Sequence, residues 1–122
     1  MEEKRKIEKV EDFIVYQKAM KCFEMFIEQD LPALNSNYIG KELARQLVRS
    51  LDSICANLEE GYGRKFGDEF KHFVRIARGS ARESKGRYVR CKSFLPSSVV
   101  EGRVARLDEV LAMLHSLLQK LV

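Results

Sequence analysis

The sequence predicts an all-α protein, an antiparallel up-down-up-down four-helix bundle. Four segments carry apolar residues at steps of three and four, the spacing of one helix face, and no segment is a convincing strand. Glycine occurs seven times and proline twice in 122 residues, so little interrupts the helices. The connections between the segments are short, which favours antiparallel neighbours.

The first predicted helix spans residues 12–29. Asp12 is placed to cap its N-terminus, and one face is apolar: Tyr16, Ala19, Met20, Phe23, Phe26 and Ile27. The helix is expected to end at Asp30-Leu31-Pro32, because proline disfavours a helical residue before it and has no N–H to donate.

The second predicted helix spans residues 38–61. Gly61 and Gly63 are expected to stop it. Its apolar face is formed by Leu43, Leu47, Leu51, Ile54 and Leu58.

The third predicted helix spans residues 68–94, with a core face of Phe70, Phe73, Ala77, Ala81, Ser84, Tyr88, Cys91 and Leu95. The middle of this face is small, so a neighbouring helix can approach closely. Gly79 and Gly86 weaken the helix by roughly 1 kcal/mol each relative to alanine. They either permit a close contact or are simply tolerated.

The fourth predicted helix begins with a Ser98-x-x-Glu101 capping box. A coiled-coil-like seam follows: Val100, Val104, Leu107, Leu111, Leu114, Leu118 and Leu121. Val110, Met113 and Leu117 widen the apolar arc beyond one seam, which indicates burial in the core or contact with another subunit. The bundle then covers residues 12–122, and residues 1–11 form a charged N-terminal arm.

Positive charge is concentrated on the third helix. Residues 70–92 hold eight Lys or Arg and one acid, whereas the rest of the chain has 14 bases and 17 acids. On a helical wheel, five cations fall within about 80° of one another, beside the core face. They form the basic stripe: Lys71, Arg75, Arg78, Arg82 and Lys85. Lys92 continues this row, and Arg87 and Arg90 lie on the opposite flank.

Like charges one turn apart repel, so something is expected to offset them. A nucleic-acid phosphate backbone is one possibility, and an acidic surface supplied by Glu59 and Glu60 or by Asp108 and Glu109 is another. The third is a solvated face without a specific role. Stacking surfaces for bases are offered by Tyr62, Phe66 and Tyr88, although Tyr88 also lies on the core face and Phe66 could instead staple the third helix.

Catalytic and metal-binding motifs are absent from the sequence, so we expect no enzyme, no metal and no cofactor. Glu69-x-x-His72 has the spacing of a di-iron ligand pair, but His115 has no matching Glu. Cys22, Cys55 and Cys91 are odd in number and far apart, and are expected to be buried thiols. Without a secretory signal or a membrane-spanning run, the protein is expected to be cytoplasmic.

Residues on the second and third predicted helices form a polar motif: Gln46, Arg49, Ser53, Asn57, Glu60, Ser80 and Glu83. Together with the stretch DFIVYQKAM that begins at Asp12, this motif resembles the four-helix bundle proteins encoded in intervening sequences of bacterial 23S ribosomal RNA genes. The resemblance covers residues 12–120. Physically, the motif residues form polar rows that can fix helix register through hydrogen bonds, a structural role more than a catalytic one.

The resemblance implies a homo-oligomeric ring, commonly a pentamer, without enzymatic activity. The chain is also similar in type to accessory variability proteins of diversity-generating retroelements, basic rings that bind nucleic acid and a reverse transcriptase. We therefore expect an accessory protein that binds RNA or RNA–DNA hybrid phosphates through the basic stripe, with Arg87, Arg90 and Lys92 contributing. The alternative is a scaffold that docks an acidic partner protein.

Overall fold

The computed structural model describes residues 9–64 and 67–121, which contain four long helices and no strand. The long helices are α1 (Ile14–Met25), α3 (Tyr38–Arg64), α4 (Gly67–Arg90) and α5 (Ser97–Lys120). Shorter elements are η1 (Val10–Asp12), η2 (Phe26–Asp30), α2 (Leu31–Leu34) and η3 (Cys91–Ser93). The predicted all-α fold class is confirmed. Most of the predicted arm, and Phe66, lie outside the described residues.

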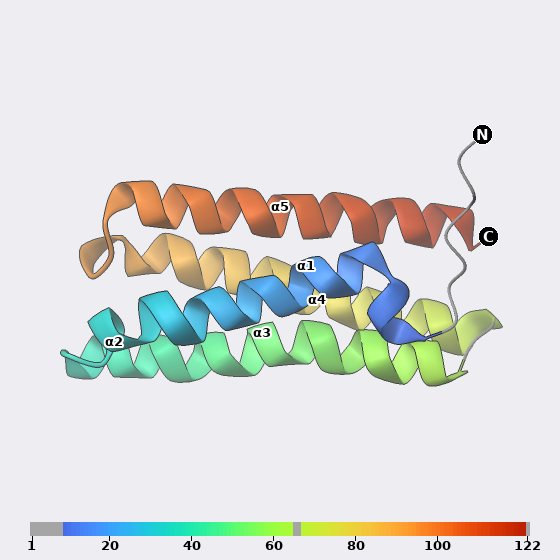
Figure 1. The fold of residues 1–122 in the computed structure, drawn as a ribbon, viewed down its shortest axis with the longest axis horizontal. Coiled ribbons are helices and arrows are strands. Elements are labelled where there is room, and N and C mark those ends of the chain that lie inside the picture. The colour runs from blue at the N-terminus through green and yellow to red at the C-terminus, as the bar shows by residue number, and fades with distance from the viewer. Residues whose placement is uncertain (1–8, 65–66, 122) are drawn as a thin grey trace.

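The four long helices lie side by side along the long axis of the molecule (Figure 1). α3 packs on α1 and α4, and α5 packs on the same two helices, so the contacts close around one core. The buried centre of α4 is small, with Ala77, Ala81 and Ser84 all inaccessible, and α4 packs closely on α3 there. Gly79 faces open space instead, so it is tolerated and not required for a close contact.

The first helix does not end where the sequence predicts. It continues through η2, a π-helical segment in which the Leu31 N–H donates to the Phe26 carbonyl, and into α2. Pro32 lies in the first turn of α2, where a missing N–H is harmless. The predicted cap is also wrong, because Phe13 precedes α1 without a side-chain cap and Asp12 accepts the Lys9 N–H instead.

Three other predicted helix ends need correction. Gly61 and Gly63 do not stop α3, which continues to Arg64. The Ser98-x-x-Glu101 capping box is not formed, because Pro96 occupies the N-cap position and Ser98 already lies inside α5. The α-helical part of the third helix ends at Arg90 and gives way to η3.

The core face of α5 is shifted relative to the predicted seam. The structure buries Val100, Arg103, Leu107, Val110 and Leu114, whereas Val104, Leu111 and Leu118 are only partly buried. The predicted and the observed sets of core positions are both apolar over most of α5. Because the observed set includes a charged residue, Arg103, the sequence did not favour it. The wide apolar arc therefore serves mainly the bundle core.

A buried ionic cluster joins η2, α4 and α5. Asp30 accepts hydrogen bonds from Tyr88 Oη at 2.6 Å and from Arg103 Nε at 2.9 Å, and Arg103 also donates to the Gln29 side chain. Burial, followed by the bond to Asp30, raises the pKa of Tyr88, and the same carboxylate raises the pKa of Arg103. The cluster fixes the π-helical turn against the other two helices.

All three cysteines are buried and free, as predicted. Burial raises the pKa of Cys55 to about 12 and of Cys91 to about 11, from an ordinary value of 9.0. Buried thiols of this kind are chemically inert.

These shifts predict how stability depends on pH. In the unfolded chain the thiols lose protons near pH 9, whereas the folded protein holds them until about pH 11 to 12. The stability that this difference contributes is fully present below pH 9 and is lost as the pH rises through that window. Urea midpoints measured from pH 7 to 11 should therefore fall above pH 9, and fall less steeply in Cys91→Ala. A flat profile would contradict the prediction.

Candidate nucleic-acid interface

The basic stripe lies along the outside of α4. The core face of the helix holds Phe70, Val74 and Tyr88 in the interior, while Arg75 and Arg82 are exposed. Lys71, Arg78 and Lys85 are partly buried at the flank. The stripe runs beside α5, because Lys85 Nζ lies 2.7 Å from Asp108 Oδ1 in that helix.

Three guanidinium groups of the stripe have no carboxylate partner within residues 9–64 and 67–121. Among the described residues, no ion pair involves Arg75, Arg78 or Arg82. They occupy successive turns of α4 and leave a row of unpaired positive charge on its outer side. An anion with several negative groups can neutralise such a row.

The four acids considered as alternative partners are mostly engaged elsewhere. Glu60 pairs with Arg64, Glu109 pairs with Lys18, and Glu59 accepts the Tyr16 hydroxyl. Within the described part of the chain, Asp108 is the one acid that reaches the stripe, through Lys85. An acidic neighbouring helix therefore compensates one end of the stripe only.

The remaining predicted cations are not brought together with the stripe. Arg90 is exposed, and its guanidinium reaches back towards Gly86. Lys92 is exposed in η3, and Arg87 turns towards α3 on the other flank. The eight cations therefore do not form one surface. Five lie in the basic stripe, Arg87 lies on the flank facing α3, and Arg90 and Lys92 lie at the C-terminal end of α4 and in η3.

The predicted aromatic surfaces are largely unavailable. Tyr88 is 1% exposed and packs edge-on against Phe26, so the packing interpretation holds. Tyr62 is partly buried edge-on against Phe13. Tyr88 is therefore not available to stack on a base, and Tyr62 is partly covered.

Polar motif residues meet in a groove between α3 and α4. This polar groove has a volume of about 500 Å³, and its lining includes Gln46, Arg49, Ser53, Ser80, Glu83 and Arg87. Five of these belong to the predicted polar motif. The other two motif residues are not in its lining: Asn57 donates to the carbonyl and hydroxyl of Ser53, and Glu60 pairs with Arg64 near the end of α3.

Serine hydroxyls form the floor of the polar groove and tie the two helices together. Ser53 and Ser80 share a hydrogen bond of 2.7 Å, and Ser84 donates to Ser50 at 2.7 Å. Their small side chains let the helices approach closely, and the bonds fix one register. The Ser50–Ser84 pair could not be predicted from the sequence, because both residues also fit an apolar stripe.

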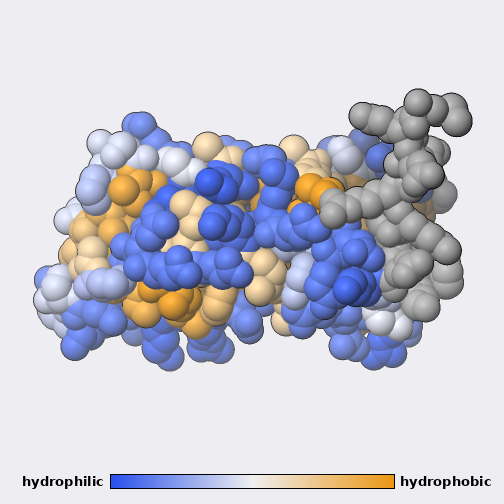
Figure 2. Space-filling model, in the orientation of Figure 1, coloured by the Kyte–Doolittle hydropathy of each residue, from blue (hydrophilic) through white to orange (hydrophobic). Residues whose placement is uncertain are grey.

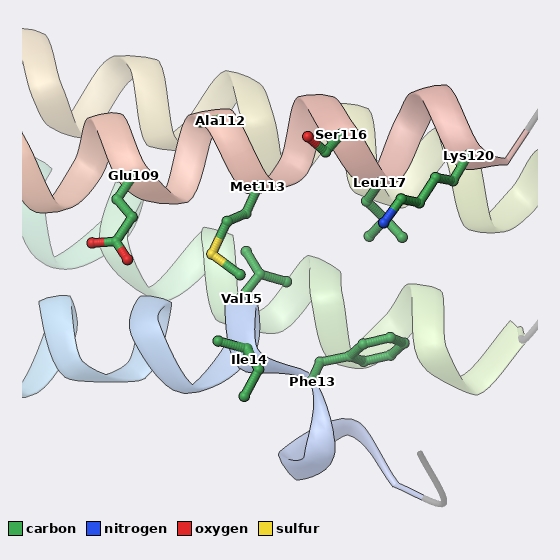
Figure 3. A pocket seen from close by; sticks show the side chains of 9 residues that line it. All are labelled: Phe13, Ile14, Val15, Glu109, Ala112, Met113, Ser116, Leu117 and Lys120. Carbon is green, nitrogen blue, oxygen red and sulfur yellow. The ribbon is translucent and has the colours of Figure 1, made fainter. Parts of the chain in front are cut away.

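An apolar groove lies on the opposite side of the bundle, between the start of α1 and α5. It has a volume of about 510 Å³. Figure 3 shows Ile14 and Val15 facing Met113, with Glu109 at one end and Lys120 at the other. Met113 and Leu117, two of the residues that widen the apolar arc, therefore border this groove, whereas Val110 is fully buried.

On the face that Figure 2 shows, hydrophilic side chains of the described residues lie between apolar patches. None of the helices in residues 9–64 and 67–121 is long and apolar enough to cross a membrane. In the same residues, no three His, Cys, Asp or Glu side chains gather as metal ligands, and His72 is exposed.

Comparison with known families decides the assignment. The model of the 23S rRNA-intervening sequence protein family matches residues 11–116. The chain belongs to this family. No curated protein and no solved structure matches it. In this 23S rRNA-intervening sequence protein, the matched region takes in α1, α3 and α4 entirely and most of α5.

Proposed function

We propose that this protein is a non-enzymatic, oligomeric accessory protein that binds nucleic acid. The observation that carries the proposal is the row of guanidinium groups on successive turns of α4 that form no ion pair with any described residue. Such a row matches consecutive phosphates, and arginine suits them because its planar fork donates two parallel hydrogen bonds.

The bound nucleic acid in this proposal is RNA or an RNA–DNA hybrid in the cytoplasm. The bundle has up-down-up-down topology, so α4 lies between antiparallel neighbours and presents its remaining face to solvent. A ring of copies, with a pentamer favoured, repeats the stripe and multiplies a modest number of phosphate contacts. A further part of the proposal is that the protein assists a reverse transcriptase of a diversity-generating retroelement.

A second candidate function is a scaffold that docks an acidic partner protein. The Lys85–Asp108 ion pair favours it, because it shows that a carboxylate can lie against the stripe. Capture of partners with and without nuclease separates the two functions. A partner retained after nuclease supports the scaffold, and a partner lost with the nucleic acid supports the first proposal.

Charge reversal of Arg75, Arg78 and Arg82 to Glu tests RNA binding directly. Affinity for single-stranded RNA at 50 mM salt is expected to fall by about 100-fold or more, because three phosphate contacts become repulsive. The slope of log K against log salt should become shallower by about 2 in the corresponding Gln variant. Fluorescence anisotropy over a salt series measures both quantities.

The matched control reverses three exposed cations elsewhere, Lys21, Lys41 and Arg106, and so makes the same change in net charge. It is expected to weaken binding by less than about tenfold. Equal losses in the two variants would show that net charge matters and the stripe does not, which would refute the proposal.

A further inference from the structure

We propose that the polar groove between α3 and α4 is a binding site for a phosphate group, carried on a free nucleotide or on a nucleic-acid chain. The groove lies on the flank of α4 away from the basic stripe, so it is a separate site. The inference does not depend on RNA binding by the stripe.

Two arginines from different helices supply the charge of this site. Arg49 reaches the groove from α3 and Arg87 from α4, and among the described residues neither makes an ion pair. Arg87 Nε is buried and has no hydrogen-bond partner in the described part of the chain. A buried donor without an acceptor is costly, and a phosphate oxygen would satisfy it together with a neighbouring Nη–H in one bidentate contact.

The serine floor adds a further donor. One O–H of the Ser53 and Ser80 pair makes the bond between them, whichever residue donates. Ser53 Oγ also accepts a hydrogen bond from the Asn57 side chain. The Ser84 hydroxyl donates to the backbone carbonyl of Ser80 and makes no bond with the Ser80 hydroxyl. The second O–H of the pair therefore remains available beside the groove.

The donors thus converge from both walls and from the floor, which suits a ligand with several acceptor oxygens. A phosphate offers three or four, whereas a carboxylate offers two. The volume of about 500 Å³ exceeds what a bare phosphate ion fills, so there is room for the sugar or base attached to it. The exposed side chain of Ile76, also in the lining, provides an apolar surface for that part of the ligand.

Glu83 sets the affinity of the site. Its carboxylate lines the same groove and has no ion pair within the described residues, so it opposes an incoming anion. Glu83→Gln removes this repulsion at an exposed position where the fold is not at risk. The variant is therefore expected to bind phosphate more tightly, an effect that a purely structural role for Glu83 would not produce.

The test uses the full chain with adenosine monophosphate as probe and adenosine as its phosphate-free control. Calorimetry measures affinity, and the NMR signal of the Arg87 Nε–H reports occupancy. Binding of the monophosphate should weaken about tenfold in Arg49→Gln and in Arg87→Gln, and strengthen about threefold in Glu83→Gln. The Gln variants of Lys21, Lys41 and Arg106, exposed cations outside the polar groove and the basic stripe, should leave it within about twofold.

The two sources of the phosphate are separated by repeating the series with single-stranded RNA. A loss of RNA affinity in the Arg49 and Arg87 variants supports a nucleic-acid phosphate, and a loss confined to the monophosphate supports a free nucleotide. The proposal is overturned if the monophosphate binds no better than adenosine, or if Glu83→Gln weakens binding. It is also overturned if the Arg49 and Arg87 variants change only the oligomeric state, because the groove would then be an interface between copies.

Discussion

Replacing Asp30 with alanine is expected to lower the free energy of unfolding by about 3 to 5 kcal/mol. Asp30 is 1% exposed and is bonded by both Arg103 and Tyr88. Removal of the carboxylate leaves the Arg103 guanidinium largely buried without its counter-charge and the Tyr88 hydroxyl without its acceptor. Urea denaturation monitored by circular dichroism measures the loss.

The exposed Lys85–Asp108 pair provides the matched control. These side chains are 41% and 50% exposed, so Asp108→Ala is expected to cost less than about 1 kcal/mol. The double variant Asp30→Leu with Arg103→Met should recover much of the stability, because it removes both charges and fills the space with apolar atoms. The prediction fails if Asp30→Ala is no more destabilising than Asp108→Ala.

Replacing Gly40 with alanine is expected to destabilise the protein by about 3 kcal/mol or more. Gly40 lies in the first turn of α3, where the side chain of Asn37 accepts the N–H of Ile39 at 2.8 Å. A Cβ atom at position 40 would overlap the carbonyl oxygen of Leu34 at the end of α2. Because the obstacle is backbone, α2 and α3 would have to separate. Thermal and urea unfolding of Gly40→Ala measure the effect.

Gly79→Ala is the comparison for this substitution. Position 79 lies within α4 and faces open space, so alanine meets no clash there. It should stabilise the protein by about 0.5 to 1 kcal/mol, since glycine loses more backbone entropy in a helix. Opposite signs for the two substitutions would confirm that packing at Leu34 requires glycine, and equal effects would contradict it.

The sequence alone was sufficient to predict the four helical segments and the burial of the cysteines. Helix-forming residues with apolar positions every three or four residues bury one face wherever they pack, so the four segments and the buried thiols followed from local spacing alone. The same spacing placed Arg75, Arg78 and Arg82 along one side of α4. Periodicity of this kind fixes which residues share a helix face.

Periodicity does not determine which faces of two different helices pack against each other. Only the tertiary structure determines which residues of distant helices meet. Asp30 and Arg103 are 73 positions apart, and only the π-helical turn and the register of α5 bring them together in the core. In the same way, packing of α4 on α3 separates Arg87 from the basic stripe and places it in the polar groove. A charged residue is buried at low cost only when a distant segment supplies an opposite charge or hydrogen-bond partner. Local sequence spacing does not predict that pairing.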